Sequence, residues 1–434
     1  MLEHHEYRAV GEFEPQESVL ITWPSTKYVY PGFDWETTAV EIVKELREVV
    51  KVYVQVDFRS PEEIAGILTA AGVPLDNIEF VKFTSDFIDM PKDQQEAYEM
   101  NYEVSYFRDY GAEVVMDDEG RRANVEFDQA WFMLDGANRY DRAAAIQTAA
   151  QRWHAELVGI NKHFPSMFTS EGGDREFNGD GVFMGVKSTE CDKRNPQFTQ
   201  EEVEREYSRL FNVKKFVWLP NGSYEDEDYA LGAIPGPDGE FNAYRSQTAN
   251  GHVDEIARFV STDTILLAEV TEEEAAHDKL AALNKERLDA AYEAIKAATD
   301  VHDKPFNIIR IPVPEPIYVD FDMDVDSVVG TAWADVRDRE TLFDGTPAPK
   351  GVVKFLPALS YANFLITNNL VVAQKYWSEG MPESIREKDE EARRVLESCF
   401  PDRRVVQINT LALNLNGGGI HCFTRHVPAS RKRA

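Results

Sequence analysis

Apolar residues recur with two different spacings in the first part of the chain, and the two spacings alternate. The stretches SVLITW (residues 18–23) and KVYVQV (51–56) predict strands. Between them Asp34 can cap a helix, and a second helix at 61–71 precedes a strand at 78–83. Strands that alternate with helices in this way are typical of an α/β fold. The apolar positions of the first helix are Ala39, Ile42, Val43, Leu46 and Val50.

A different pattern begins near residue 108 and then repeats. Each repeat has a polar loop, a short apolar strand, a turn rich in Gly, Asn or Asp, and a second strand. Repetition of one unit favours a radial or stacked array of α/β modules around one centre. The repeats span 108–127, 171–186, 250–270 and 360–374, a strand at 405–408 begins a fifth, and helices are predicted at 140–157, 199–210, 271–298 and 383–398.

Charge and cysteine content narrow the class of protein. The formal net charge is −31, from 77 acidic and 46 basic residues, which argues against nucleic acid and anionic membranes as partners and favours a cationic ligand. Three cysteines in a chain of 434 residues argue against a disulfide framework and for a reducing compartment. With neither a long apolar run nor a secretory h-region, we expect a cytoplasmic protein without a membrane span.

Every repeat carries a polar residue with catalytic potential just before its first strand. In a closed array of modules, equivalent positions converge on one axis. We therefore expect a thiol, an imidazole and carboxylates to share one site, which is more specific than any single motif. These residues are Asp109, Glu171, His252 with Asp254, Asn363, and Cys422.

Taken singly, most of these residues also have a structural explanation. Asp109 can belong to a local ion pair or turn, and Glu171 can be a solvated turn residue beside two glycines. His252 and Asp254 lie two apart, on one side of a strand, and fit a hydrogen-bonded edge pair equally well.

The glycine loop 417–419 before Cys422 is equally ambiguous when read alone. It fits a turn followed by a buried structural cysteine, and it fits a loop that brings backbone close to a ligand beside a nucleophile. His421 would point away from Cys422 in a strand, so we do not favour it as the base. We expect no zinc site, because no Cys-x-x-Cys or His-x-x-x-His spacing occurs.

Over nearly its whole length the chain resembles the agmatine deiminase and bacterial-type peptidylarginine deiminase family of guanidino-modifying enzymes. The resemblance implies a single domain over residues 1–434, folded as a five-bladed α/β propeller with pseudo-fivefold symmetry. Insertions are expected near 221–245 and 271–300, and the acidic first one reads as a surface loop. The matching motifs are Glu14-Pro15-Gln16-Glu17, Trp23-Pro24, Arg108-Asp109-x-Gly111, Glu171-Gly172-Gly173, Gly251-His252-Val253-Asp254, Tyr361-x-Asn363-Phe364 and Gly417-Gly418-Gly419-Ile420-His421-Cys422.

The resemblance also implies a role for each matching residue. Asp109 and Asp254 would hold a planar guanidinium, because carboxylates match its N–H fork. Cys422 would attack as a thiolate, with its pKa lowered by an adjacent imidazolium or by the bound cation. His252, oriented by Glu171, would protonate the departing ammonia and then activate water against the covalent S-alkylthiouronium intermediate. This chemistry requires no metal and no organic cofactor.

Substrate identity is less sharply defined than the reaction. We assign Trp23, Arg108, Asn363, Asp174 and Gly419 to substrate binding beside the two acids. Asp174 stands where the family usually has Asn, and would suit a dication such as agmatine, whereas Arg108 could pair with the carboxylate of arginine. We expect hydrolysis of agmatine to N-carbamoylputrescine and ammonia.

Other functions remain open at this stage. Arginine or peptidylarginine deimination is the main alternative, and an amidinotransferase would use the same residues. A non-catalytic amine-binding protein and a cysteine peptidase explain fewer of them. The expected partner is a small cationic guanidino compound, and a homo-oligomer is compatible with the sequence.

Overall fold

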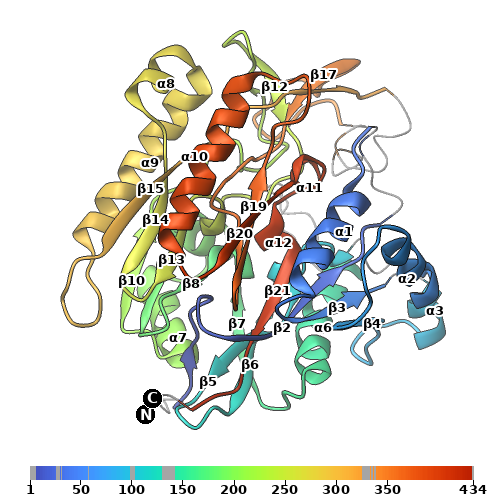
Figure 1. Cartoon of the computed structure of the whole chain (residues 1–434). Coiled ribbons are helices and arrows are strands. Elements are labelled where there is room, and N and C mark those ends of the chain that lie inside the picture. The colour runs from blue at the N-terminus through green and yellow to red at the C-terminus, as the bar shows by residue number, and fades with distance from the viewer. Residues whose placement is uncertain are drawn as a thin grey trace.

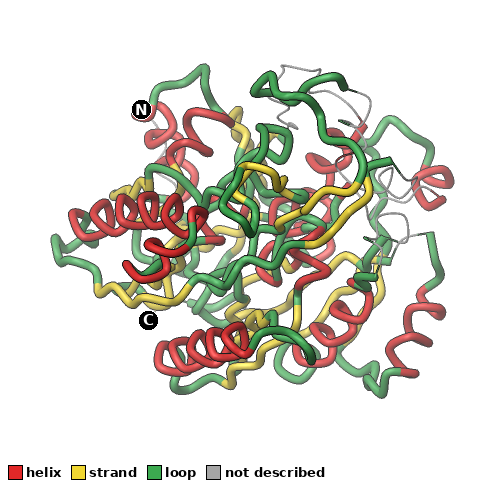
Figure 2. The backbone as a smooth tube through the Cα atoms, turned by 90° about the horizontal axis from the view of Figure 1, so that it is seen from above, coloured by secondary structure: helices red, strands yellow, loops and turns green. Residues whose placement is uncertain are grey.

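A computed structural model describes residues 6–25, 30, 32–56, 58–97, 103–129, 142–324, 333, 336 and 339–432. Within these residues the chain forms an α/β fold of six mixed sheets. The longer helices lie around the outside of the molecule and the strands lie between them (Figures 1 and 2). The α/β class predicted from the apolar spacing is confirmed.

Five of these sheets share one connectivity. In each, a first strand runs antiparallel to a second strand, and the second runs parallel to a third. Two of the five carry one more edge strand, β1 (Arg8–Ala9) or β4 (Ile78–Val81). The sheets are β5 (Glu113–Met116), β6 (Arg122–Asp128) and β7 (His163–Thr169); β8 (Glu176–Phe177), β9 (Val182–Val186) and β10 (Lys215–Leu219); β13 (Ala257–Ser261), β14 (Thr264–Glu269) and β15 (Asn307–Pro312); β18 (Leu365–Thr367), β19 (Leu370–Lys375) and β20 (Arg404–Asn409); and β21 (Thr424–Pro428), β2 (Gln16–Thr22) and β3 (Lys51–Gln55).

The last of these sheets joins the two ends of the chain. Its antiparallel pair consists of β21, next to Cys422, and β2, with Leu20 opposite Arg425. The strand predicted at 405–408 exists as β20, but it is the third strand of the preceding sheet rather than the start of a fifth unit. The expected fifth unit is therefore corrected, because strand pairing across the chain ends replaces a local hairpin.

The acidic insertion forms part of the sixth sheet, which consists of β11 (Ile234–Pro235), β12 (Phe241–Arg245), β16 (Val319–Asp322) and β17 (Val352–Leu356). The expectation of a surface loop is wrong for its first half, because Asp226 and Asp228 are buried. Only the tip around residues 237–242 is exposed. Backbone N–H groups that donate to Asp226 explain how an acidic segment can enter the interior.

Helices begin where capping residues predict them. Asp34 accepts from the backbone of Glu36, and Thr199 with Glu202 forms a capping box. The single helix expected over 271–298 is instead two helices, because the side chain of Asp278 caps the second. The α-helices are α1 (Trp35–Leu46), α2 (Pro61–Ala70), α3 (Lys92–Ala97), α5 (Phe107–Tyr110), α6 (Arg142–Leu157), α7 (Gln200–Phe211), α8 (Glu272–His277), α9 (Lys279–Ala297), α10 (Glu383–Cys399), α11 (Leu411–Leu415) and α12 (Ile420–Phe423).

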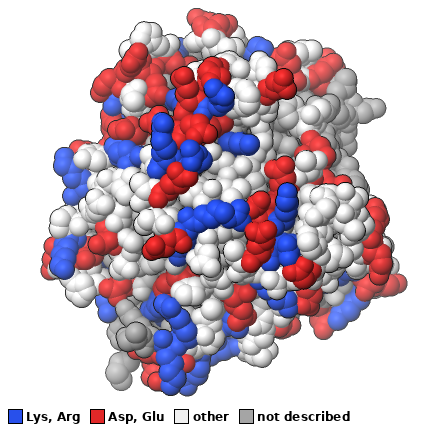
Figure 3. Space-filling model, in the orientation of Figure 1, with Lys and Arg blue, Asp and Glu red and all other residues white. Residues whose placement is uncertain are grey.

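The surface carries both signs of charge, with an acidic excess. Asp and Glu side chains gather at the upper edge of the face in Figure 3, over α8 and α10, while Lys and Arg are interspersed across the middle. Among the residues that the structure describes, no helix is long and apolar enough to cross a membrane.

Candidate active site

The thiol of Cys422 is held by an asparagine from the loop that precedes β18. Glycines 417–419 lead into α12, so Cys422 lies in a short helix rather than in a strand, and it is 2% exposed. Asn363 donates from Nδ2 to Sγ at 3.1 Å and accepts from the Cys422 N–H at 3.2 Å. A Cβ on Gly418 would lie 2.9 Å from Sγ, so the glycine loop leaves room for the sulfur.

His252 forms a charged chain with Glu171 and Arg194. Its Nε2 lies 2.8 Å from Glu171 Oε2, and that oxygen also accepts from Arg194 Nε and Nη2 at 2.8 and 2.6 Å. Burial would raise the pKa of Glu171, but Arg194 and His252 lower it to about 2. Burial would lower the pKa of His252, but the carboxylates of Asp109 and Glu171 raise it well above its ordinary value. These carboxylates therefore favour the charged form of the imidazole.

Asp109 and Asp254 approach His252 around a glycine. Gly173 donates its N–H to Asp109 Oδ1 at 2.8 Å, and Asp109 lies 3.9 Å from the Nδ1 atom of His252. A Cβ on Gly173 would lie 2.4 Å from that Nδ1 atom and 3.2 Å from an oxygen of each acid. Position 173 therefore requires glycine, because a Cβ there would collide with the His252 ring. Burial raises the pKa of Asp109 to about 6, with Glu171 and Asp254 adding to the effect of burial and His252 opposing it.

Replacing Gly173 by alanine is therefore expected to lower the activity of the enzyme about 100-fold without unfolding it, since misplacement of catalytic groups by about 1 Å has effects of this size. Gly66→Ala is the matched control, because nothing lies within 4 Å of a Cβ at that helical position. Initial rates and thermal unfolding of both variants test this expectation. Equal activities of the two variants would contradict it.

A cavity opens onto these groups. Its lining includes the Cys422 thiol, the His252 imidazole and the carboxylates of Asp109, Glu171 and Asp228. Three tyrosines and several amide side chains complete the walls. Acid groups, an imidazole and a thiol around one cavity suit a planar cation that is attacked by sulfur.

Six residues predicted to bind substrate do not line this cavity. Two of them, Asp254 and Asn363, lie directly behind the lining, 3.5 and 3.1 Å from the sulfur of Cys422. Trp23 donates to Glu36 from within a hydrophobic core, and Gly419 faces Gln374. Asp174 is fully buried and accepts from the backbone of Val186 and Val253, so it shapes the loop that carries His252. Arg108 donates from Nε to the backbone carbonyl of His421, and its Nη1 lies 2.9 Å from Nδ1 of the half-buried His426, so it is not positioned to meet a substrate carboxylate.

The surroundings of Cys422 do not agree with the expectation that an adjacent imidazolium lowers the pKa of its thiol. In the ligand-free chain, burial and the carboxylates of Asp254, Glu255 and Asp109 raise the pKa of Cys422 well above its ordinary value, against a smaller opposing effect of Asn363. An adjacent imidazolium therefore does not leave the thiol ionised. A bound cation, the other predicted cause of ionisation, would neutralise the surrounding acids.

Several residues near the site carry no local sequence signal. Glu255 Oε1 lies 3.7 Å from Sγ, and Asp226 accepts from the N–H groups of Gly251 and His252. Asp254, Glu255 and Cys422 bring one carboxylate or thiol atom each to within 4.8 Å of one another. The acidic run at 225–228 is the one visible signal for Asp226, and its length suggests only a loop.

The comparisons with known proteins agree with this geometry. The model of the Porphyromonas-type peptidyl-arginine deiminase family matches residues 8–232 and 241–428. The agmatine deiminase of Pseudomonas aeruginosa (strain LESB58) is 26% identical over 432 residues, which cover 98% of this chain and 96% of that protein. The solved structure of the agmatine deiminase of Enterococcus faecalis catalyzing its reaction has a TM-score of 0.68 at 20% identity, covering 98% and 97% of the two chains. A cysteine-to-serine variant of the C. jejuni agmatine deiminase, with substrate bound, has a TM-score of 0.64 at 18% identity, covering 98% and 97%.

An α/β fold of mixed sheets, with a thiol, an imidazole and carboxylates around one cavity, defines a cysteine-bearing deiminase type of site. The chain belongs to the Porphyromonas-type peptidyl-arginine deiminase family. It is accordingly a hydrolase of carbon–nitrogen bonds in linear amidines, which confirms the predicted family and enzyme class.

Proposed function

We propose that the protein hydrolyses the guanidino group of agmatine to N-carbamoylputrescine and ammonia, with Cys422 as nucleophile. The observation that carries this proposal is the convergence of Cys422, His252, Glu171 and Asp109 on one cavity. These residues come from segments far apart in sequence, and each precedes the first strand of its sheet. A purely structural role would not require them to meet around an open space.

The reaction follows from the charges at the site. A bound guanidinium places positive charge among Asp109, Asp254 and Glu255, and so lowers the cost of ionising the thiol. The thiolate attacks the guanidino carbon, and protonated His252 gives its proton to the departing nitrogen, which leaves as ammonia. Neutral His252 then takes a proton from water as the oxygen attacks the thiouronium carbon. The C–S bond breaks and the remaining hydroxyl proton passes to bulk water, where it converts the released ammonia to ammonium. The ureido product leaves with the thiolate and the imidazolium restored, and the thiolate regains from water the proton that it lost to water when the cation bound.

The charge of the cavity walls favours agmatine over arginine. Within the described part of the chain, Arg194 is the one Lys or Arg of the lining, and Glu171 engages it through two hydrogen bonds. A substrate carboxylate would therefore meet a wall without a cation available to pair with it. Agmatine keeps the amine of arginine but has a hydrogen in place of the carboxylate.

Asp228 supplies the matching acid for that amine. The other acids of the 225–228 run are engaged: Glu225 by Asn284, Asp226 by backbone N–H groups, and Glu227 by Arg287. Among the hydrogen bonds of the described residues, the Asp228 carboxylate accepts only the N–H of Ala230, at 2.9 Å, and Asp228 is 6% exposed in the cavity wall. Burial raises its pKa, which a neighbouring ammonium would reverse.

Ammonia release from agmatine, arginine and arginine-containing peptides tests the proposed function. We expect release from agmatine, with arginine and the peptides at least about 100-fold slower, because an uncompensated buried charge costs several kcal/mol. Faster release from arginine or from a peptide would identify the protein as an arginine or peptidylarginine deiminase instead. Release of a new guanidine in the presence of amines would indicate an amidinotransferase, and no reaction with any compound would refute deimination.

Asp228→Asn is expected to raise KM for agmatine about 10- to 100-fold, because it removes the charge opposite the amine. The same substitution is expected to leave 1-butylguanidine, which lacks the amine, within about twofold of wild type. Asp238→Asn is the matched control, because Asp238 is an exposed acid at the tip of the same insertion. Equal effects of Asp228→Asn on both compounds would remove Asp228 from amine recognition.

The shared connectivity of five sheets supports a five-bladed propeller, with the pairing of β21 and β2 as the closure of its ring. Site residues before the first strand of each sheet would then face one axis. A single domain, a homo-oligomer and a reaction without a cofactor stay predictions, and light scattering of the purified protein would test the oligomeric state.

A further inference from the structure

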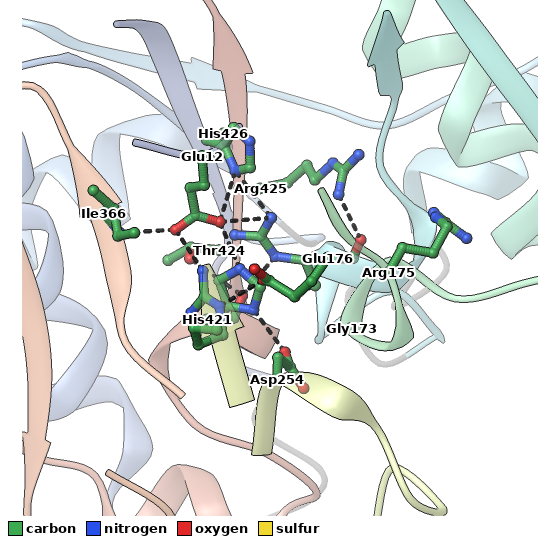
Figure 4. A network of polar contacts seen from close by, with 12 residues as sticks. Glu12, Gly173, Arg175, Glu176, Asp254, Ile366, His421, Thr424, Arg425 and His426 are labelled. Atoms are coloured by element: carbon green, nitrogen blue, oxygen red, sulfur yellow. Dashed lines mark hydrogen bonds and ion pairs between the residues drawn. The ribbon is translucent and has the colours of Figure 1, made fainter. Parts of the chain in front are cut away.

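A buried polar network adjoins Asp254 (Figure 4), and the reaction above uses that acid but neither Glu12 nor His421. Its centre is His421, which is 1% exposed and lies between two carboxylates. The Nδ1 atom lies 2.6 Å from Asp254 Oδ2, and the Nε2 atom lies 2.6 Å from Glu12 Oε2. Glu12 precedes β2, so the network joins both ends of the chain to the active site.

The geometry defines the protonation of this chain. A neutral imidazole has one N–H donor and one acceptor nitrogen. Both ring nitrogens of His421 face carboxylate oxygens, and two acceptors cannot share a hydrogen bond without a proton between them. Arg258 and Arg108, at 3.0 and 3.4 Å, keep Glu12 ionised. Each ring nitrogen of His421 therefore shares a proton with one carboxylate.

Glu12 is itself fixed in place. It accepts the N–H of Ile366 at 2.8 Å and lies 3.0 Å from Arg258 and 3.4 Å from Arg108. An anchored carboxylate of this kind orients the imidazole that it contacts. Glu12 thus fixes the orientation of the His421 ring, and the ring fixes the orientation of the Asp254 carboxylate.

Asp254 depends on that contact. It is fully buried, its Oδ1 atom has no hydrogen-bond partner among the described residues, and its Oδ2 atom is held by His421 and lies 3.5 Å from the sulfur of Cys422. Without His421, the carboxylate would lose its one charged donor while it remained buried beside another acid, Glu255.

We propose that Glu12 and His421 are positioning residues that hold Asp254 ionised and in one orientation beneath Cys422. The contacts from Glu12 through His421 to Asp254, which we call the relay, keep a second acid besides Asp109 in place for the guanidinium before substrate binds. His421 acts through Asp254 and does not contact substrate, because its two ring nitrogens face Asp254 and Glu12. This inference rests on the proposed deimination.

The proposed relay predicts a specific change in the pH dependence of kcat/KM. Protonation of Asp109 or Asp254 would remove its attraction for a guanidinium, so the acidic limb of kcat/KM has two steps, one at the pKa of Asp109, about 6, and a lower one at the pKa of Asp254. Burial would raise the pKa of Asp254, but His421 lowers it, and removal of His421 therefore moves the lower step to higher pH. The charged and titratable groups that face Asp254 are His421, Cys422, Glu255, His252 and Arg258, and those that face His421 are Glu12, Asp254, Glu176 and His426.

The test compares His421→Gln and Glu12→Gln with His426→Gln in the full-length enzyme. His426 contacts Glu12 at 3.4 Å and Arg108 at 2.9 Å in the same network, but it neither hydrogen-bonds to Asp254 nor pairs with it. We expect His421→Gln to lower kcat/KM for agmatine about 100-fold and to move the lower step of its acidic limb upward by about one pH unit or more. Glu12→Gln is expected to move that step in the same direction by less, and His426→Gln is expected to leave that step unchanged.

The outcomes separate a positioning role from a structural one. Equal losses in the His421 and His426 variants with unshifted limbs would overturn the proposal. Failure of both the His421 and the Glu12 variant to fold, while His426→Gln folds, would also overturn it and assign the network to stability. A wild-type enzyme that acts on no guanidino compound would instead refute the proposed function on which the relay depends.

Discussion

Replacing Cys422 by alanine is expected to abolish ammonia release from agmatine, lowering kcat by at least about 10⁴-fold, or about 5.5 kcal/mol of barrier. The sulfur is the one atom that forms and breaks a covalent bond with the guanidino carbon in the proposed reaction. The remaining acids can bind the cation, but no second thiol lies in the described lining to replace that of Cys422. A direct attack by water would have to cross the full uncatalysed barrier.

The chain offers matched controls for this experiment in its other two cysteines. Cys191 is buried in a hydrophobic cluster, and Cys399 lies at the end of α10. Burial raises the pKa of Cys191 to about 12 and that of Cys399 to about 11, so neither is a reactive thiol at neutral pH. Alanine at either position should keep activity within about threefold. Loss of activity in either control, or full activity in Cys422→Ala, would refute the assignment of the nucleophile.

Because burial and the nearby acids raise the pKa of Cys422 without ligand, the free enzyme should react slowly with iodoacetamide at this thiol. A bound cation reverses the effect of the acids and also shields the sulfur, so the rate of alkylation does not report the substrate-bound state. Turnover and mass spectrometry of a trapped covalent adduct therefore provide the decisive readouts for Cys422.

Local sequence patterns predicted most strands and helices of the fold. Alternating apolar residues identified β3, and a capping box identified the start of α7. These elements depend on neighbours a few residues away, which the sequence displays directly. Two-residue strands such as β1 and β8 have too little pattern to detect. The pairing of β21 with β2 joins the two ends of the chain, and no local spacing encodes it.

The same distinction applies to the site. Asp109, Glu171, His252, Asp254, Asn363 and Cys422 recur before the first strand of successive units, and the structure brings them together. Glu12, Arg194 and Glu255 have no such position and act through contacts made only in the folded chain. Arg108 and Asp174 lie outside the cavity lining for a related reason. A charged residue beside a motif can face the interior when a buried partner lies there, as the backbone of Val253 does for Asp174.

Substituting His252 by glutamine is expected to lower kcat for agmatine about 10³-fold, because general acid–base catalysis contributes factors of about 10²–10⁴. The protonated imidazole is needed to release ammonia, and the neutral form is needed to activate water. Glutamine can fill the space but cannot exchange a proton near neutral pH. Asp226, which accepts the backbone N–H of residue 252, should keep the loop in place.

Glu171→Gln is the matched charge variant, and its effect has a defined sign. The carboxylate raises the pKa of His252, so activity that requires the imidazolium is present below that pKa and is lost as pH rises through it. Removing the charge lowers the pKa, and the alkaline limb of kcat/KM should move to lower pH while a hydrogen bond to Nε2 remains available. His252→Gln should show no such limb. Glu171 lies 2.8 Å from Nε2 of His252, so removing its charge must change the pKa of the imidazole. An unshifted alkaline limb in Glu171→Gln would therefore mean that His252 does not act as the acid, even if the variant is slower.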